Sequence, residues 1–178
     1  MRAVIIRHAE VDYCWIRRCT SEVFDSQCRK YDISPIRNVT YNIPQPVYQK
    51  IYVSELSRSH DTAKILFPNG KYSESRLINE VPLKSCFDTK QEMPLWFWSL
   101  VGRLQWFINS KRQVESRRQT RERAREFAEL IGNDGMDIAV VTHGFYMHTL
   151  LREMKKMGFR MTGSSVKYKN GEYVIAEK

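Results

Sequence analysis

Two histidines follow short apolar segments that are typical of buried strands. Arg7 and His8 come directly after residues 3–6, and His143 comes just after residues 138–141. Ligands of α/β proteins bind at the carboxyl ends of parallel strands, so these side chains meet if the two strands are neighbours. An imidazole with a free ring nitrogen can attack phosphorus, and a guanidinium offers phosphate several donors. The two segments therefore predict a site at which a histidine attacks a phosphoryl group.

A second arginine, Arg58, lies where its charge is unfavourable for a helix. We predict a strand at 51–54 and a helix at 57–67, which ends before a proline and a glycine. Arg58 then lies in the first turn, whose N–H groups already carry partial positive charge. A solvated arginine there would cost only roughly a few tenths of a kcal/mol. An anion bound between Arg58 and these N–H groups would remove the conflict.

Four segments, taken in order, resemble the histidine phosphatase superfamily, which also contains the cofactor-dependent phosphoglycerate mutases. They are Arg7-His8-x-Glu10, Ser54-x-Leu56-x-Arg58-x-x-x-Thr62-Ala63, Asn79-Glu80 and Val141-Thr142-His143-Gly144. The segments span residues 7–144, and the second is the most specific. The resemblance implies a three-layer α/β/α sandwich around a mainly parallel central sheet, and it implies no metal and no cofactor.

The resemblance also assigns roles by position. His8 is the nucleophile that forms a phosphohistidine, while Arg7, Arg58 and His143 bind the phosphoryl group. Glu80 protonates the leaving oxygen and then activates water.

The chain departs from the family pattern near both carboxylate motifs. Ala9 and Val11 replace the glycine and threonine of Arg-His-Gly-Glu-Thr, and the Gly-x-x-Glu pattern usual beyond Glu80 is missing. Glu10 and Asp12 are therefore alternative candidates for the general acid.

The elements predicted around these motifs form one α/β domain over residues 1–178. We predict strands at 2–6, 51–54, 75–78 and 138–142, and helices at 57–67, 95–108, 114–131 and from 143 to Gly158. The C-terminal segment is predicted to form a hairpin that pairs Val166/Tyr168 with Tyr173/Ile175 around a turn at Asn170-Gly171. The pattern favours a mostly parallel sheet with helices on both faces. Residues 11–49 read as irregular, and with 81–112 they are expected to shape the pocket.

Residues 95–108 are apolar on nearly every face and include Trp96, Trp98 and Trp106. Such a helix is usually buried. The segment can simply pack in the core, or it can form a wall or lid of the pocket. In the second case the protein would favour substrates with an apolar or aromatic part. A self-association face or an interfacial membrane contact is a further alternative.

The charge balance favours anionic partners. The chain has 29 basic and 20 acidic side chains, a net charge of +9. The basic stretch 111–125 is typical of a solvated helix face, and without a recognisable module we expect no nucleic-acid partner. No apolar run reaches about 20 residues, so we expect no membrane span.

The cysteines and the remaining histidines suggest no further site. Cys14, Cys19, Cys28 and Cys86 form no zinc-type spacing, and the N-terminal apolar run is too short for a signal peptide, so we expect free thiols and a cytoplasmic protein. His60 and His148 are expected to be surface or supporting residues.

These observations predict a metal-independent phosphatase that hydrolyses a small phosphorylated substrate through His8. Phosphoglycerate-mutase-type phosphotransfer is the close alternative, although the chain is short for it. A non-catalytic phospholigand-binding module is the other alternative. The presence of both histidines, both arginines and a carboxylate favours an enzyme.

Overall fold

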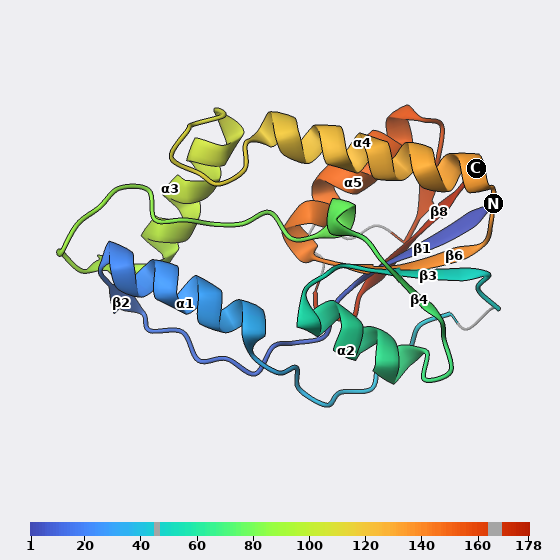
Figure 1. Ribbon diagram of the computed structural model, residues 1–178, viewed down its shortest axis with the longest axis horizontal. Helices are drawn as coiled ribbons and strands as arrows, with labels where there is room; N and C mark the ends of the chain where they lie inside the picture. Colours follow the sequence, from blue (N-terminus) through green and yellow to red (C-terminus); the bar gives the residue numbers. More distant parts are fainter. Residues whose placement is uncertain (45–46, 164–168) are drawn as a thin grey trace.

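The computed structural model describes residues 1–44, 47–163 and 169–178, and within them six strands form one mixed sheet (Figure 1). The strands are β1 (Arg2–Arg7), β3 (Lys50–Val53), β4 (Tyr72–Glu74), β6 (Ile138–Thr142), β7 (Arg160–Thr162) and β8 (Tyr173–Glu177), in the order β4-β3-β6-β1-β8-β7. Strands β4, β3, β6 and β1 run parallel, whereas β8 is antiparallel to β1 and β7 is antiparallel to β8. The mainly parallel sheet with a C-terminal hairpin confirms the predicted class.

Strand β1 shows why the sheet needs a layer on each face. Its residues Ala3 and Ile5 enter one apolar cluster, and Val4 and Ile6 enter another. Successive side chains of a strand point to opposite faces, so a strand that is apolar at every position must be covered on both. Strand β6 alternates in the same way.

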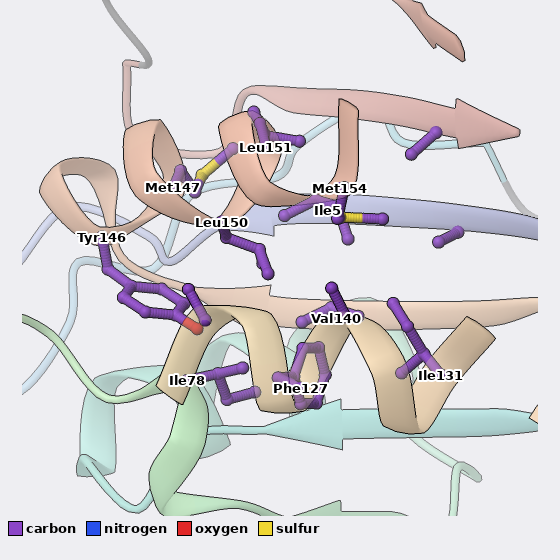
Figure 2. Close-up of a cluster of buried hydrophobic side chains, with 14 of the residues drawn as sticks. Ile5, Ile78, Phe127, Ile131, Val140, Tyr146, Met147, Leu150, Leu151 and Met154 are labelled. Atoms are coloured by element: carbon purple, nitrogen blue, oxygen red, sulfur yellow. The ribbon is translucent and has the colours of Figure 1, made fainter. Parts of the chain in front are cut away.

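Helices supply those two layers (Figure 1). Helix α2 (Ser57–Leu66) covers one face, and α4 (Arg117–Asp134) and α5 (Gly144–Lys156) cover the other. Figure 2 shows Phe127 of α4 and Leu150 of α5 beside Val140 of β6. The apolar stripes predicted for these two helices are buried: Ala124, Phe127, Ala128 and Ile131, and Met147, Leu150, Leu151 and Met154. The three-layer sandwich is therefore present.

Capping residues fix the ends of α4. The Ser116 hydroxyl accepts the Gln119 N–H, and the Gln119 side chain accepts the Ser116 N–H, which forms a capping box. Gly135, in the left-handed region at φ 65°, ends the helix. The helix therefore lies about three residues later at each end than the predicted 114–131.

Two predictions of local structure were wrong. Residues 11–49 are not wholly irregular, because they contain β2 (Arg18–Cys19) and α1 (Ser21–Ile33). Helix α1 buries only Ser21, Phe24 and Gln27, so it lacks the apolar period that reveals a helix. Residues 75–78 are not a strand, because β4 ends at Glu74 and a 3-10 helix, η1 (Arg76–Ile78), follows.

The C-terminal hairpin differs from its prediction in its first strand. Strand β8 pairs with β7 at 160–162, whereas Val166 and Tyr168 lie outside the described residues. Asn170 and Gly171 form a turn just before β8, with Gly171 at φ 75°.

A smaller unit, which we call the cap, stands beyond the carboxyl ends of the parallel strands (Figure 1). It consists of α1, α3 (Leu95–Phe107) and the two-stranded sheet of β2 with β5 (Met93–Pro94). Its core contains Cys19, Phe24, Cys86 and Trp98, and the Trp98 indole donates to the Cys19 carbonyl at 3.0 Å. Within the described residues, no helix is long and apolar enough to cross a membrane.

Candidate active site

Strands β1 and β6 bring the two predicted histidines together. Arg7 ends β1 opposite Thr142 of β6, and the His8 N–H donates to the Thr142 carbonyl at 2.9 Å. The rings of His8 and His143 are 5.0 Å apart between centroids. The predicted adjacency of the two strands is therefore confirmed.

His8 is held in one orientation by its own loop. Its Nδ1 lies 2.7 Å from the Ala9 carbonyl oxygen, which can only accept, so Nδ1 carries the hydrogen and Nε2 keeps a lone pair. Burial lowers the pKa of His8 to about 3, and the nearby positive charges of Arg58 and Arg7 act in the same direction. The ring is therefore neutral near pH 7, as a nucleophile requires.

Two distant side chains fix the backbone around His8. The Thr62 hydroxyl of α2 accepts the Ala9 N–H at 2.9 Å and donates to the Arg58 carbonyl at 2.6 Å. The Asn170 amide donates to the carbonyls of His8, at 3.0 Å, and Ala9, at 3.1 Å. The sequence had suggested Asn170 only as a turn residue, and no local pattern connects it with His8.

His143 is fully buried, and both of its ring nitrogens contact other side chains. Its Nε2 lies 2.7 Å from the Ser54 hydroxyl, and Arg58 Nε donates to its Nδ1 at 3.2 Å. Because an arginine Nε can only donate, Nδ1 accepts and Nε2–H donates to Ser54. Burial lowers the pKa of His143 well below its usual range, and the positive charge of Arg58 acts in the same direction.

Arg58 lies in the first turn of α2, as predicted, and an anion accompanies it. The side chain is 1% exposed, and its Nη1 is 2.8 Å from a carboxylate oxygen of Asp32 on α1. The Tyr31 ring lies 5.1 Å from its Cζ. The predicted conflict between Arg58 and the helix N-terminus is thus relieved by Asp32, which the sequence analysis missed because α1 itself was missed.

Glu80 lines the pocket at the loop after η1. Its carboxylate accepts the N–H groups of Val81 at 2.9 Å, Tyr146 at 3.0 Å and Phe145 at 3.3 Å, the last two from the first turn of α5. These donors hold the carboxylate at the N-terminus of α5, the helix that begins directly after His143.

The alternative carboxylates lie elsewhere. Glu10 and Asp12 are more than half exposed and pair with Arg37 at 2.8 and 3.3 Å. Neither lines the pocket. Of the three carboxylates considered from the sequence, the structure brings only Glu80 to the site.

Gly144 allows Arg7 to lie against the start of α5. A Cβ at position 144 would be 2.8 Å from Arg7 Nε and 3.0 Å from its Cζ. Any larger side chain would therefore displace the guanidinium that the sequence assigns to phosphate binding.

A cavity of about 1180 Å³ lies between the sheet and the cap, and the fully buried His143 is not part of its lining. Its lining includes Arg7, His8, Arg58 and Glu80 at one end, and residues from both 11–49 and 81–112 elsewhere. Trp15 and Tyr31 contribute an aromatic wall, with ring centroids 5.3 Å apart.

Helix α3 is a wall of this cavity, although not through its tryptophans. Leu95, Ser99 and Arg103, which are four residues apart and so share one side of the helix, line the cavity. Trp98 and Trp106 are buried in the interior, and Trp106 donates to the Thr120 hydroxyl at 2.8 Å. Trp96 is 64% exposed.

The other histidines have ordinary surroundings. His60 lies 3.2 Å from Glu74, and His148 is an exposed residue of α5 whose pKa is lowered by partial desolvation. Across the described ranges, no three histidine, cysteine, aspartate or glutamate side chains gather in a way that would hold a metal ion.

Comparisons with known proteins place the chain in a family. A sequence model of the histidine phosphatase superfamily (branch 1) matches residues 3–177. No curated protein is similar enough in sequence to match. Three solved structures with the same fold are each 15% identical, and each alignment covers 98% of this chain and 89% of the other.

These three structures come from different organisms. They are the product of an open reading frame of Mycobacterium tuberculosis (TM-score 0.57), a putative alpha-ribazole-5'-P phosphatase from Escherichia coli (0.54) and a mutant phosphoserine phosphatase from Entamoeba histolytica in complex with phosphoserine (0.53). At this identity they establish only the shared fold, whereas the family match spans nearly the whole chain. The chain belongs to the histidine phosphatase superfamily (branch 1).

Proposed function

We propose that the protein is a phosphomonoester hydrolase that works through a covalent phosphohistidine at His8. The observation that carries the proposal is the state of the His8 ring. Its Nδ1–H donates a hydrogen bond to the Ala9 carbonyl, which leaves Nε2 unprotonated. The neutral ring lines a cavity that Arg7 and Arg58 also line. A phosphoryl group is the substrate portion that two guanidinium groups recognise best.

The reaction proceeds in two displacements. In the first, His8 Nε2 attacks phosphorus in line, the bond from phosphorus to the ester oxygen breaks, and Glu80 gives its proton to that oxygen. In the second, Glu80 takes a proton from water, the resulting oxygen attacks phosphorus, and the phosphorus–nitrogen bond breaks. Inorganic phosphate and neutral His8 are the products, and Glu80 is again protonated.

Substrate binding rearranges the contacts of Arg58. In the structure its guanidinium contacts Asp32 and His143 Nδ1. The phosphoryl group replaces Asp32 as the anionic partner, because it offers three oxygens to the same donors. His143 stays anchored to Ser54 through Nε2, and its Nδ1 accepts the Nε–H of Arg58, so that it supports Arg58 from below the cavity surface.

The remainder of the cavity indicates the kind of ester. Trp15 and Tyr31 form a wall next to Arg58, and Leu95 and Val81 add apolar surface. Such a wall favours a small phosphorylated substrate with a planar or apolar part next to the phosphate. The proposal includes no metal and no cofactor, and with four free thiols we place the protein in the cytoplasm.

Rapid-quench labelling tests the proposal. The protein is mixed briefly with a panel of ³²P-labelled phosphomonoesters, and both the protein label and released phosphate are measured. We expect an acid-labile, alkali-stable label and phosphate release, both lost in His8→Gln and kept in His60→Gln. An acid-stable label, or full turnover by His8→Gln, would contradict the mechanism. Accumulation of an isomeric phosphoester instead of free phosphate would indicate a mutase.

A further inference from the structure

Helix α3 presents a contiguous apolar surface to solvent. The surface, which we call the apolar face, consists of Trp96, Leu100, Leu104, Phe107 and Ile108, with exposed fractions of 64, 54, 54, 52 and 70%. Their spacing of three and four residues places them along one side of the helix. The buried residues Trp98, Gly102 and Trp106 lie along the opposite side.

The apolar face is separate from the cavity. The cavity is lined by Leu95, Ser99 and Arg103, a third side of the same helix, and by no member of the apolar face. Helix α3 stands at one end of the molecule, away from the sheet (Figure 1). Large apolar side chains gathered in this way on a surface mark an interaction site.

A basic hollow adjoins the C-terminal end of the apolar face. This hollow, of about 300 Å³, is lined by Asn109, Arg117, Arg118, Arg121, Glu122, Arg125 and Glu153. Four arginines outnumber two glutamates there, and three of the arginines form surface ion pairs, with Glu122, Glu153 and Glu129, which a lipid phosphate can replace at little cost. The Arg117 guanidinium lies 4.2 Å from the centroid of the Phe107 ring, and the Asn109 side chain accepts the Arg118 N–H at 3.0 Å. The hollow and the apolar face are therefore continuous.

The sequence of α3 and of most of the loop after it carries charge of one sign. No acidic residue occurs from 93 to 114, a stretch that contains all of α3 together with Arg103, Lys111 and Arg112. At the other end of the helix, the exposed Arg17 and Arg18 lie beside it: the Leu95 N–H donates to the Arg17 carbonyl, and Arg18 bonds the Glu92 carbonyl.

We propose that the apolar face and the basic hollow dock the protein on the surface of an anionic lipid bilayer. Exposed tryptophan, phenylalanine and leucine beside arginine are the composition of a helix that lies in the membrane interface. The apolar side chains enter the headgroup boundary, and the arginines of the hollow bind lipid phosphates. The inference does not depend on the phosphatase reaction, because no residue of the apolar face lines the cavity.

A second copy of the chain fits this surface less well. If two apolar faces packed together around a two-fold axis, the arginines at the two ends of α3, Arg17 and Arg18 at one and Arg117 at the other, would approach arginines of the second copy. Each chain also carries a net charge of +9, so the approach is opposed by repulsion. An anionic surface satisfies the apolar and the charged parts together.

Vesicle co-sedimentation tests the proposal. Phosphatidylcholine vesicles with and without phosphatidylserine are used as probes, and the bound fraction is measured at low and high salt. We expect binding to the anionic vesicles at least about tenfold tighter than to the neutral ones, and weaker in high salt. The double variant Leu100→Glu/Leu104→Glu should bind at least about tenfold more weakly.

Matched variants make the result specific. Ile33→Glu changes an 81% exposed apolar residue at the end of α1 and should bind like the wild type. Arg118→Gln/Arg125→Gln, which alters two highly exposed arginines of the hollow, should lower binding to anionic vesicles only. Hydrolysis of a water-soluble substrate should be unchanged in all three.

Three results would overturn the proposal. The first is no binding of the wild type to anionic vesicles, and the second is equal loss of binding in Ile33→Glu. The third is a concentration-dependent dimer in solution that Leu100→Glu/Leu104→Glu abolishes, which would show that a second copy covers the apolar face.

Discussion

The buried, neutral state of His8 predicts a specific loss of stability in acid. In an unfolded chain the pKa of a histidine is about 6.5, whereas in the folded protein burial lowers the pKa of His8 to about 3. Below pH 6.5 the unfolded state therefore binds a proton that the folded state does not. The stability contributed by neutral His8 is complete above the unfolded pKa and is lost progressively as the pH falls toward 3.

The size of the effect follows from these two values. At pH 7 few unfolded chains carry the proton, and at pH 5 nearly all do, while folded His8 stays neutral at both. The free energy of unfolding should fall by about 2 kcal/mol between pH 7 and pH 5 from His8 alone. His143, whose pKa is lowered in the same direction, adds a further loss with the same sign.

Urea unfolding at the two pH values measures this loss. The fall in the free energy of unfolding should be about 2 kcal/mol smaller in His8→Gln than in the wild type. His60→Gln is the matched control, because His60 lies partly exposed beside Glu74, and it should retain the wild-type fall. An identical fall in His8→Gln and the wild type would refute the reasoning, since it would mean that His8 titrates alike in both states.

Three further predictions address the site and its walls. Gly144→Ala should lower kcat/KM by about 10–100-fold with the circular dichroism spectrum unchanged, because the added Cβ displaces the Arg7 guanidinium. An unaltered kcat/KM would mean that Arg7 does not bind the phosphoryl group. Trp98→Ala should lower the free energy of unfolding by about 3–5 kcal/mol because Trp98 is buried, whereas Trp96→Ala should change it by less than about 0.5 kcal/mol because Trp96 is exposed. Similar losses in the two variants would contradict the assignment of Trp98 to the buried side of α3 and of Trp96 to its exposed side. Phosphatase activity should survive EDTA, and a loss restored by Mg²⁺ or Mn²⁺ would disprove a metal-independent mechanism.

The parts of the fold that could be predicted are those whose apolar pattern is imposed by burial. Strands β1 and β6 are covered on both faces, so each is a continuous apolar run that can be recognised in the sequence. The histidines that follow the two strands therefore lie next to each other, as predicted. Helices α4 and α5 rest one face on the sheet and show the corresponding period. By contrast, α1 lies over a cavity that is lined by charged and aromatic side chains together, and its sequence carries no such period.

The site residues that were missed act from far along the chain. Asp32 reaches Arg58 across 26 positions, and Asn170 reaches His8 across 162. Neither has a spacing that a local pattern could reveal, because their partners are set by how β8 and the cap pack. Thr62 and Ser54 lie within the recognised Ser54–Ala63 segment, and their hydrogen bonds to Ala9 and His143 supply the physical reason for that pattern.

The contacts of the Asn170 turn have a consequence for when the loop around His8 takes its final form during synthesis. The Asn170 amide holds the carbonyls of His8 and Ala9, the Gly171 N–H donates to the Arg7 carbonyl, and the Arg7 N–H donates to the Glu172 carbonyl. A growing chain that has passed Glu80 and even His143 still lacks these bonds. His8, the proposed nucleophile, is thus among the first residues made and among the last to be set in place. A ribosome-bound fragment that ends before Asn170 contains every proposed catalytic residue, but the bonds that hold the His8 loop are still missing.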